Sequence, residues 1–381
     1  MAAMGGRSGT VLAEELVVHG FVSQGLVYTD HNGYIDDDAG WSGKLSSAAL
    51  NGSVQLGERW RLAGQGMYLN GGNRYREGGR LDYLLLDYSL LHYLEGEVHL
   101  MLGRYKNAHG LYRDTRDVPS AQPGIIPPQS VYWDIYRDIT LNTDGASLLG
   151  VHFSEAGTFE WQLSGGSTDI DNDTLNWVLG PRARGDLEED YVAQGSLYFT
   201  EASERWKLGV SSLYSKLRYD SSDPSTALSG KSRVWESILS AQYRSERWEW
   251  TFEYIYDRFE FRGLFSPLFN ERVNSDGYYL QALYDLSPGL RLMMRYDARY
   301  LDTSDRDGHK RERVTGQPEY FAYAKDLTAG ISWQGGDQWV LRGEYHYIDG
   351  TAWIAPQLFS DVQTNDSRYW SLFALQLSYW F

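Results

Sequence analysis

The sequence predicts an all-β protein, a transmembrane antiparallel up-and-down β-barrel of about 16 strands. Three observations lead to this prediction. Segments in which apolar and polar residues alternate recur along the chain, short and long connections join them in strict alternation, and aromatic residues make up 15% of the 381 residues. Alternation with a period of two indicates strands with one apolar and one polar face. Short turns at one rim and long loops at the other are typical of membrane barrels.

The alternating segments and the connections between them define the expected elements. The short connections are residues 57–59, 94–96, 154–157, 201–204, 245–247, 287–289 and 335–337. Seven short turns, with both termini on the same rim, give an even number of strands, as bacterial barrels require. The expected strands are residues 16–29, 45–56, 60–69, 81–93, 97–105, 141–153, 158–166, 191–200, 205–219, 232–244, 247–260, 276–286, 290–301, 320–333, 338–349 and 367–381.

The composition suits a protein that sits between lipid and water. The chain contains 29 Tyr and 14 Trp, residues that favour membrane–water interfaces because an apolar ring carries a polar tip. No apolar run approaches the ~20 residues that a membrane helix needs, and a closed barrel is the other structure that pairs every backbone amide in lipid. Tryptophans beside the short turns are expected to form an interfacial girdle: Trp60, Trp206, Trp248, Trp333 and Trp339.

The polar face of the strands should line the lumen, because charged side chains facing hydrocarbon are costly. In the segment 247–257 aromatic residues alternate with mostly charged ones, and in the segments 290–301 and 338–348 apolar or aromatic residues oppose charged ones. We therefore expect a hydrated lumen whose wall carries Arg291, Arg295, Asp297, Arg299, Arg342 and Glu344. The three arginines on one strand could equally be a ladder of ion pairs with Asp297 and neighbouring strands.

One long connection, residues 106–140, differs from the others. It contains four prolines and an apolar stretch that includes Ile125, Ile126 and Trp133. Proline lowers the entropy lost on ordering, and a loop with apolar anchors is expected to fold against a wall rather than extend into water. Its charged residues should border the narrowest point of the lumen or brace the loop itself: Arg113, Asp114, Arg116, Asp117, Asp134, Arg137 and Asp138.

The sequence argues against several other classes of function. The net charge of −16 disfavours nucleic acid as a partner. No cysteine, no Gly-x-Ser-x-Gly and no His-Glu-x-x-His is present, so we expect no enzyme activity, no catalytic residues and no cofactor. Asp169, Asp171 and Asp173 have the spacing that begins a calcium loop, but the Gly and Glu that complete it are missing, and no metal site is predicted.

The C-terminal segment resembles the assembly signal of Gram-negative outer-membrane β-barrels. The chain ends on Phe381, and Tyr379, Leu377, Leu375 and Phe373 precede it at every second position. Residues 103–106, 110–119 and 128–132 are similar to porin-type proteins, and the long third loop after the fifth strand matches the general porins, although the Pro-Glu-Phe-Gly-Gly motif of enteric porins is absent.

This resemblance implies a location, partners and a loop geometry. General porins are 16-stranded barrels whose third loop folds inward and places acidic residues opposite wall arginines. The resemblance implies an outer-membrane protein that forms a homotrimer, contacts lipid and lipopolysaccharide, and is inserted by the barrel-assembly machinery. Residues 1–13 are expected to be a disordered segment outside the mature chain, and residues 14–381 a single barrel domain with the constriction loop 106–140.

Three functions remain open from the sequence. The first is a porin for passive diffusion of small hydrophilic solutes and ions. The second is a porin selective for a sugar, through lumen aromatics such as Tyr279 or Trp370, or for a small anion, through Arg291, Arg295 and Arg299. The third is a non-conducting barrel that serves adhesion, assembly or catalysis.

Overall fold

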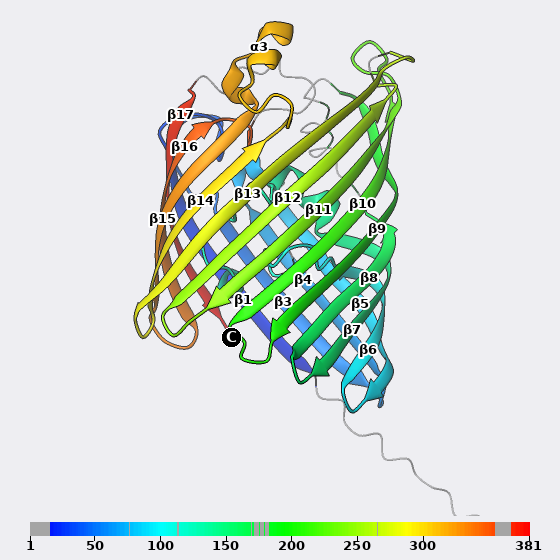
Figure 1. Cartoon of the computed structure of the whole chain (residues 1–381), viewed down its shortest axis with the longest axis vertical. Helices are drawn as coiled ribbons and strands as arrows, with labels where there is room; N and C mark the ends of the chain where they lie inside the picture. Colours follow the sequence, from blue (N-terminus) through cyan, green and yellow to red (C-terminus); the bar gives the residue numbers. More distant parts are fainter. Residues whose placement is uncertain are drawn as a thin grey trace, which may run out of the picture.

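The chain closes into one antiparallel β-barrel with its strands inclined to the long axis (Figure 1). The structure, a computed structural model, describes residues 16–75, 77–112, 114–168, 170, 175, 179, 183–264, 266–354 and 367–381. Each strand pairs with its neighbours in the sequence, and β1 pairs with β17 from Phe21↔Trp380 to Thr29↔Leu372. This last pairing closes the cylinder, so no strand edge is left to face lipid. The predicted fold class is confirmed.

The predicted strand positions are also confirmed, with differences mainly at the loop ends. The strands are β1 (Val17–Thr29), β2 (Gly40–Ser42), β3 (Ser46–Leu56), β4 (Trp60–Asn70), β5 (Gly78–Tyr93), β6 (Gly96–Lys106), β7 (Asn142–Ser154), β8 (Gly157–Ser167), β9 (Gly185–Glu201), β10 (Trp206–Ser221), β11 (Gly230–Arg244), β12 (Trp248–Arg262), β13 (Asn270–Ser287), β14 (Leu290–Tyr300), β15 (Tyr323–Gln334), β16 (Trp339–Gly350) and β17 (Tyr369–Trp380). β2 and β3 both pair with β1 and form one interrupted wall strand, so the described residues build a 16-stranded wall. β9 and β13 begin six residues earlier than expected, because charged rim residues continue the pairing.

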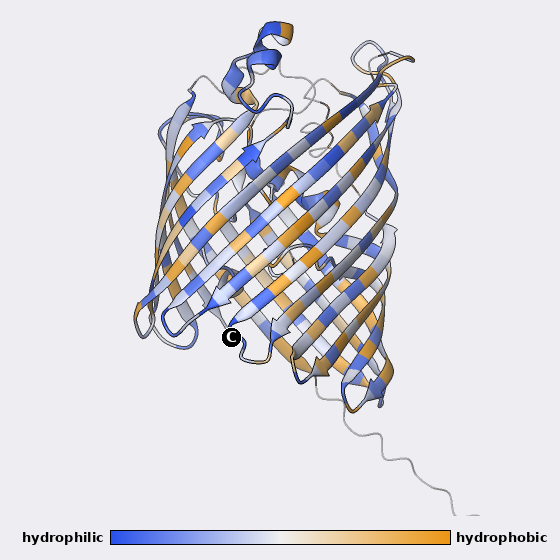
Figure 2. Cartoon of the chain, viewed as in Figure 1, coloured by the Kyte–Doolittle hydropathy of each residue, from blue (hydrophilic) through white to orange (hydrophobic). Residues whose placement is uncertain are grey.

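Hydrophobic and hydrophilic residues alternate along the strands (Figure 2), and large apolar side chains are exposed on the outer surface of the barrel. On β12 the outward residues Trp250, Phe252 and Tyr256 are 40–41% exposed, whereas the inward residues Glu253 and Asp257 are buried. The predicted assignment of the two faces is therefore confirmed. Such a surface fits the hydrocarbon core of a bilayer, whereas water would disfavour it.

The predicted aromatic girdle beside the short turns is present and follows a repeated arrangement. Its tryptophans are 38–54% exposed. Four of them pack on a tyrosine directly across the strand pair, with ring centroids 4.4–4.8 Å apart: Trp60 on Tyr88, Trp206 on Tyr243, Trp248 on Tyr284 and Trp339 on Tyr379. Cross-strand aromatic pairs stabilise a sheet, and amphipathic rings at one rim fix its depth in the bilayer.

The third loop, residues 107–141 between β6 and β7, folds into the lumen. It contains the short helices η2 (Pro119–Ala121), η3 (Asp134–Tyr136) and α1 (Arg137–Thr140). Elsewhere, the loops hold η1 (Gly72–Arg74), α3 (His309–Thr315) and η4 (Glu319–Phe321). No helix in the described part of the chain is long and apolar enough to cross a membrane.

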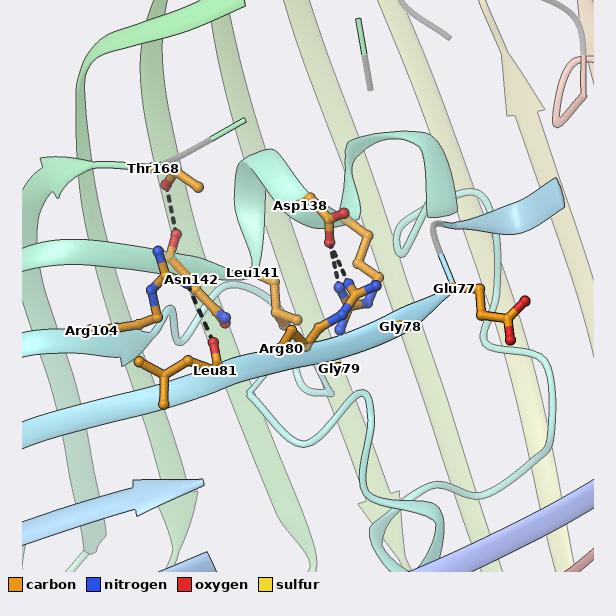
Figure 3. Close-up of a pocket in the computed structure, with 11 residues that line it drawn as sticks. Glu77, Gly78, Gly79, Arg80, Leu81, Arg104, Asp138, Leu141, Asn142 and Thr168 are labelled. Carbon is orange, nitrogen blue, oxygen red and sulfur yellow. Dashed lines mark hydrogen bonds and ion pairs between the residues drawn. The ribbon is translucent and has the colours of Figure 1, made fainter. Parts of the chain in front are cut away.

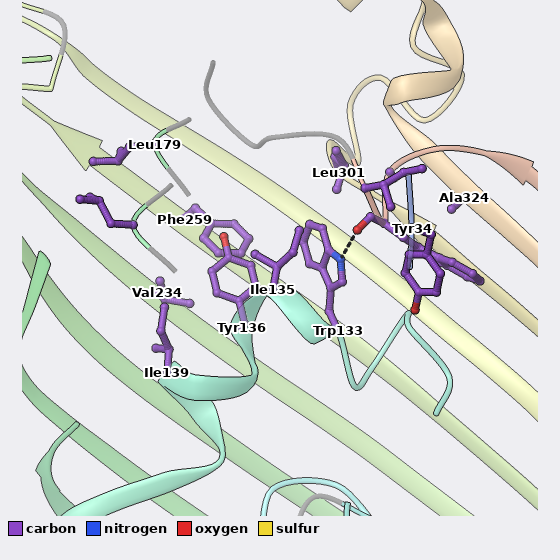
Figure 4. Packing of buried hydrophobic residues seen from close by; sticks show 14 of the residues in the cluster. Tyr34, Trp133, Ile135, Tyr136, Ile139, Leu179, Val234, Phe259, Leu301 and Ala324 are labelled. Carbon is purple, nitrogen blue, oxygen red and sulfur yellow. Dashed lines mark hydrogen bonds between the residues drawn. The ribbon is translucent and has the colours of Figure 1, made fainter. Parts of the chain in front are cut away.

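An apolar cluster packs the long-loop side of the third loop against the upper wall (Figure 4). Tyr136 stacks on Phe259 of β12, with ring centroids 5.6 Å apart. On the other side, the Trp133 Nε1 donates a hydrogen bond to the carbonyl of Trp353, 3.4 Å away, and Tyr34 packs on Trp370. The apolar residues of the loop are buried here, as the sequence predicted.

Candidate functional site: the lumen and its constriction

Six charged side chains of the barrel wall hold the third loop in place, and we call them the docking row. They are Glu253 on β12, Arg295, Asp297 and Arg299 on β14, and Arg342 and Glu344 on β16. All point inward, and none is more than 6% exposed. Their common property is that each hydrogen-bonds the main chain of the loop. Buried charges are tolerated when they are paired and hydrogen-bonded, and here the loop backbone supplies much of that pairing.

The centre of the loop is held by Glu344 and Arg295. The carboxylate of Glu344 accepts hydrogen bonds from the amides of Ile125 and Ile126, at 2.6 and 3.1 Å. Arg295 Nη2 donates to the carbonyl of Ile126, 2.9 Å away. Gly124 allows this approach, because a Cβ there would lie 2.2 Å from Glu344 Oε1.

Asp297 and Arg299 hold the next part of the loop at a single residue. Asp297 accepts a hydrogen bond from the amide of Ser130, at 3.1 Å, and Arg299 Nη1 donates to the carbonyl of Ser130, at 2.8 Å. The guanidinium of Arg299 also pairs with Asp257 and lies over the ring of Trp133, 4.9 Å from its centroid. Arg299 and Asp257 thus form an ion pair between β14 and β12, across β13, and the loop is attached to the same pair.

Glu253 is a hydrogen-bonding centre at the start of the loop. Its Oε1 accepts from the amide of Leu111 at 2.9 Å, and its Oε2 accepts from the hydroxyls of Tyr132 and Tyr279, the latter at 2.7 Å. Ser240 on β11 donates to the same carboxylate. A fully buried carboxylate with four donors fixes both ends of the loop segment that runs from Leu111 to Tyr132.

Asp134 joins the third loop to the first and second loops. It accepts hydrogen bonds from Arg74 Nε at 2.7 Å and from the Tyr34 hydroxyl at 3.1 Å, and it pairs with Arg116. All four residues are buried. Burial would raise the pKa of Asp134, but the charges of Arg74 and Arg116 outweigh that effect and lower it.

A second ion pair braces the end of the loop. Arg137 pairs with Asp117 and Asp138, and Asp138 in turn lies 3.2 Å from Arg80 on β5. Burial opposes ionisation of Asp117, but the charges of Arg137 and Lys106 lower its pKa to about 2. Arg80, Arg137 and Asp138 border a cavity of about 180 Å³ where the loop meets β5–β7 (Figure 3).

The loop leaves only a small space on the opposite side of the lumen. A cavity of about 50 Å³ lies between the loop and the wall formed by β3, β4 and β17. The loop contributes Arg116, Asp117 and Asp134, and the wall contributes Ser46 and Ser47 among others. Three of the predicted constriction residues thus line this cavity, whereas Asp114 is exposed and Arg113 lies outside the described residues.

Wider spaces lie between the loop and the short turns. One cavity of about 400 Å³ is lined by Tyr112, Gln122, Arg291 and Arg342 among others. A second, of about 330 Å³, is lined by charged residues that include Lys207 and Glu160. The cavities on the short-turn side of the loop are therefore larger than the one between the loop and β3, β4 and β17, and charged residues line them.

The resemblance implied that wall arginines lie opposite acidic residues of the third loop, and the observed arrangement is different. Arg295 and Arg299 do not face loop carboxylates across a gap, because they donate to loop carbonyls on the side where the loop is docked. Arg291, which is 2.7 Å from Asp285, faces the cavity below the loop. Tyr279 and Trp370, the aromatics expected to favour sugars, are 0% and 1% exposed and offer no surface to a solute.

The structure tests the absence of a metal site over only part of the chain. Asp169, Asp171 and Asp173 are among the residues that the structure does not describe. Within the described ranges, no group of three or more His, Cys, Asp or Glu side chains is placed to hold a metal ion.

Solved structures of outer-membrane proteins share this architecture, although no protein-family model and no curated sequence matches the chain. The outer-membrane channel DcaP of Acinetobacter baumannii has a TM-score of 0.59 at 12% identity, with both chains fully covered. The anion-selective porin from Comamonas acidovorans has a TM-score of 0.59 at 13% identity, covering 97% of this chain and 100% of that one. OmpT of Vibrio cholerae, in a trimer form, has a TM-score of 0.57 at 12% identity, with the same coverage.

The chain has the porin fold. At 11–14% identity the likeness to these structures concerns the fold alone. Within this porin fold, sequence patterns did not reveal two of the residues that hold the loop. Arg74 lies in a short polar loop without periodicity, and Glu253 is one inward residue among many on β12, so neither has a local signal that separates it from its neighbours.

Proposed function

We propose that the protein is a Gram-negative outer-membrane channel through which small hydrophilic solutes and ions diffuse passively. The observation that carries this proposal is the polar lumen of a lipid-facing barrel, narrowed by a loop that is fixed to the wall by the docking row. Passage through such a channel depends on the width and the charge of its narrowest part and needs no covalent chemistry. The protein is accordingly proposed not to be an enzyme.

Reconstitution into planar lipid bilayers tests this proposal. We expect discrete, ohmic current steps in concentrated KCl, and liposome swelling with small sugars that decreases as solute size rises. The absence of current steps, with the barrel confirmed as folded by circular dichroism and by resistance to denaturation in unheated gel samples, would contradict the channel and favour a non-conducting barrel.

A preference for small anions is the second candidate. The Comamonas relative of similar fold is described as anion-selective. In this chain, arginines line the wider space below the loop, whereas Tyr279 and Trp370, the aromatics expected to favour sugars, are buried. The reversal potential across a KCl gradient distinguishes the two candidates, because an anion preference moves it toward the chloride equilibrium potential.

We also propose that the outer surface binds lipopolysaccharide near the long-loop rim. Arg272, Arg258 and Arg233 surround one carboxylate, Glu260, with N–O distances of 2.8, 3.0 and 3.8 Å. Three cations and one anion leave a local excess of two positive charges on an acidic protein. Trp235, 53% exposed, lies on the same face nearer the middle of the bilayer. A phosphorylated lipid headgroup above an apolar chain complements this surface.

Native mass spectrometry with purified lipopolysaccharide tests the lipid proposal. The variant with Arg233→Gln, Arg258→Gln and Arg272→Gln should retain fewer bound lipopolysaccharide molecules than the unmodified protein. Arg59→Gln with Arg247→Gln, at the short-turn rim, serves as the control. Equal retention in both variants would remove this patch as a binding site.

The remaining partners follow from the fold and from the C-terminal strand. We propose a homotrimer, supported by the trimer form of the OmpT structure of similar fold. Mass measurement in detergent tests it. We further propose that β17 and Phe381 carry the signal for the assembly machinery, because Phe373, Leu375, Leu377 and Phe381 are 38–52% exposed on the outer face. Tyr379 lies on the same face and packs on Trp339.

A further inference from the structure

The cavity between the loop and the short turns has the size of a small-molecule site. Its volume of about 400 Å³ lies within the ~300–1,000 Å³ typical of ligand pockets. Loop residues Tyr112 and Gln122 form its upper side, and the ends of strands β11–β17 form the rest, including Trp380. The cavity is therefore bounded both by the constriction loop and by the wall.

The charges that line this cavity are not balanced. Arg291 pairs with Asp285 through two contacts of 2.7 and 3.1 Å, and Arg244 lies 3.1 Å from Glu249. Arg342 is the third cation of the lining, and no ion pair joins it to a carboxylate among the described residues. The three arginines and the two carboxylates leave one positive charge, in a chain whose net charge is −16.

Arg342 is also incompletely hydrogen-bonded. Its Nη2 donates to the carbonyl of Gln122, 3.0 Å away, but its Nε and Nη1 have no partner in the described part of the chain. The residue is 6% exposed, so water compensates little of its charge. A buried guanidinium with two unpartnered donors is costly, and an anion in the adjoining cavity would offset that cost.

The lining also defines what kind of anion fits. The side chain of Arg291 is 42% exposed and offers direct contact, and a guanidinium matches a carboxylate with two parallel hydrogen bonds. Tyr112 and Trp380 add ring surfaces to the same cavity. These features together suit a molecule with one carboxylate and a flat apolar body.

We propose that this cavity binds small organic carboxylates on the short-turn side of the constriction, with Arg291 contacting the carboxylate and Arg342 supplying the unbalanced charge. The inference rests on the proposed channel function, because it places a binding step within the path of the solute. It adds a defined subsite to that path. A solute bound here stays near the narrow space, and other anions cannot bind because the solute already occupies the positive charge.

Calorimetric titration of the detergent-solubilised protein with benzoate tests the subsite directly, and benzyl alcohol serves as the neutral probe of the same shape. Benzoate is expected to bind and benzyl alcohol is not. Arg342→Gln should weaken benzoate binding by about tenfold or more, which corresponds to ~1.4 kcal/mol. Arg342→Lys, which keeps the charge, should retain most of the affinity. Arg247→Gln in the adjacent short turn removes the same charge without touching the cavity and should change nothing.

The outcomes separate the subsite from the channel. Equal binding of benzoate and benzyl alcohol, or benzoate affinity unchanged in Arg342→Gln, overturns the subsite. If Arg342→Gln does not fold, Arg291→Gln takes its place and must weaken benzoate binding. Current steps in bilayers without benzoate binding support the channel proposal and reject the subsite. Benzoate binding without current steps supports the subsite and rejects the channel proposal.

Discussion

Asp134→Asn should release part of the third loop without unfolding the barrel. Asp134 is 5% exposed and is the common partner of Arg74 and Arg116. The asparagine has nearly the same shape but no charge, so two buried guanidinium groups lose their counter-ion. Removing one partner of a buried ion pair costs ~3–5 kcal/mol. The strand pairing is not touched, so this cost falls on the docking of the loop.

Hydrogen exchange of peptides from residues 107–141, measured by mass spectrometry in detergent, reports the docking equilibrium. A loss of ~3–5 kcal/mol corresponds to an increase in exchange rate of roughly 150-fold to 4,000-fold for amides that exchange through loop opening. In bilayers, the same variant should give larger and noisier current steps, because a loop released from Arg74 leaves a wider path.

Asp349→Asn is the matched control. Asp349 pairs with Arg368 at 2.7 Å, but their side chains are 23% and 36% exposed, so the same substitution there should cost less than about 1 kcal/mol. Protection of the loop that is unchanged in Asp134→Asn, or changed equally in Asp349→Asn, would refute the view that Asp134 anchors the loop.

Three further predictions concern acid, the docking row and assembly. The charges of Arg137 and Lys106 lower the pKa of Asp117 to about 2, so its contribution to loop docking is present above the ordinary carboxyl pKa of ~4 and is lost as the pH falls toward 2. Current noise in bilayers should rise as the pH falls through that range and should decrease again on neutralisation. Noise that already rises while the pH is still above 5 would contradict this origin. Glu344→Gln should weaken the hydrogen bonds from the amides of Ile125 and Ile126 by ~1.5–3 kcal/mol. Amide-resolved hydrogen exchange should then show faster exchange at both amides. An unchanged rate would exclude Glu344 as the central anchor. Phe381→Ala should reduce the amount of barrel in the outer membrane of an expressing cell but leave refolding in detergent unchanged, whereas equal losses in both would point to stability instead of recognition.

The strands could be predicted from the sequence because each carries its own signal. The alternation around Trp248–Tyr256, for example, fixes both the strand and the face that meets lipid, and seven short turns then fix the topology. The inward path of the third loop could be inferred from its prolines and apolar residues. These are local patterns, which a chain displays without reference to its distant parts.

The contacts within the lumen could not be predicted, because they join residues far apart in the sequence. Arg295 was expected to face a loop carboxylate, but it donates to the carbonyl of Ile126, a group that every residue possesses and that no sequence pattern marks. Asp134 was correctly identified as a charged loop residue, but its partner Arg74 is 60 residues away in a loop with no repeating pattern. The pairing of inward charges thus depends on the folded path of the loop.

The docking row recognises the loop through its peptide groups. Amides and carbonyls of residues such as Ile126 and Ser130 are the bound atoms, and these remain when a side chain is replaced. Apart from the ion-paired Arg116, Asp117 and Asp134, the loop can therefore accept new side chains on the surface that faces β3, β4 and β17 while following the same course. In this barrel, the docking row sets where the narrow part of the lumen lies, and the loop side chains set its chemistry. Selectivity could therefore be redesigned by substituting loop residues without changing the barrel that carries the loop.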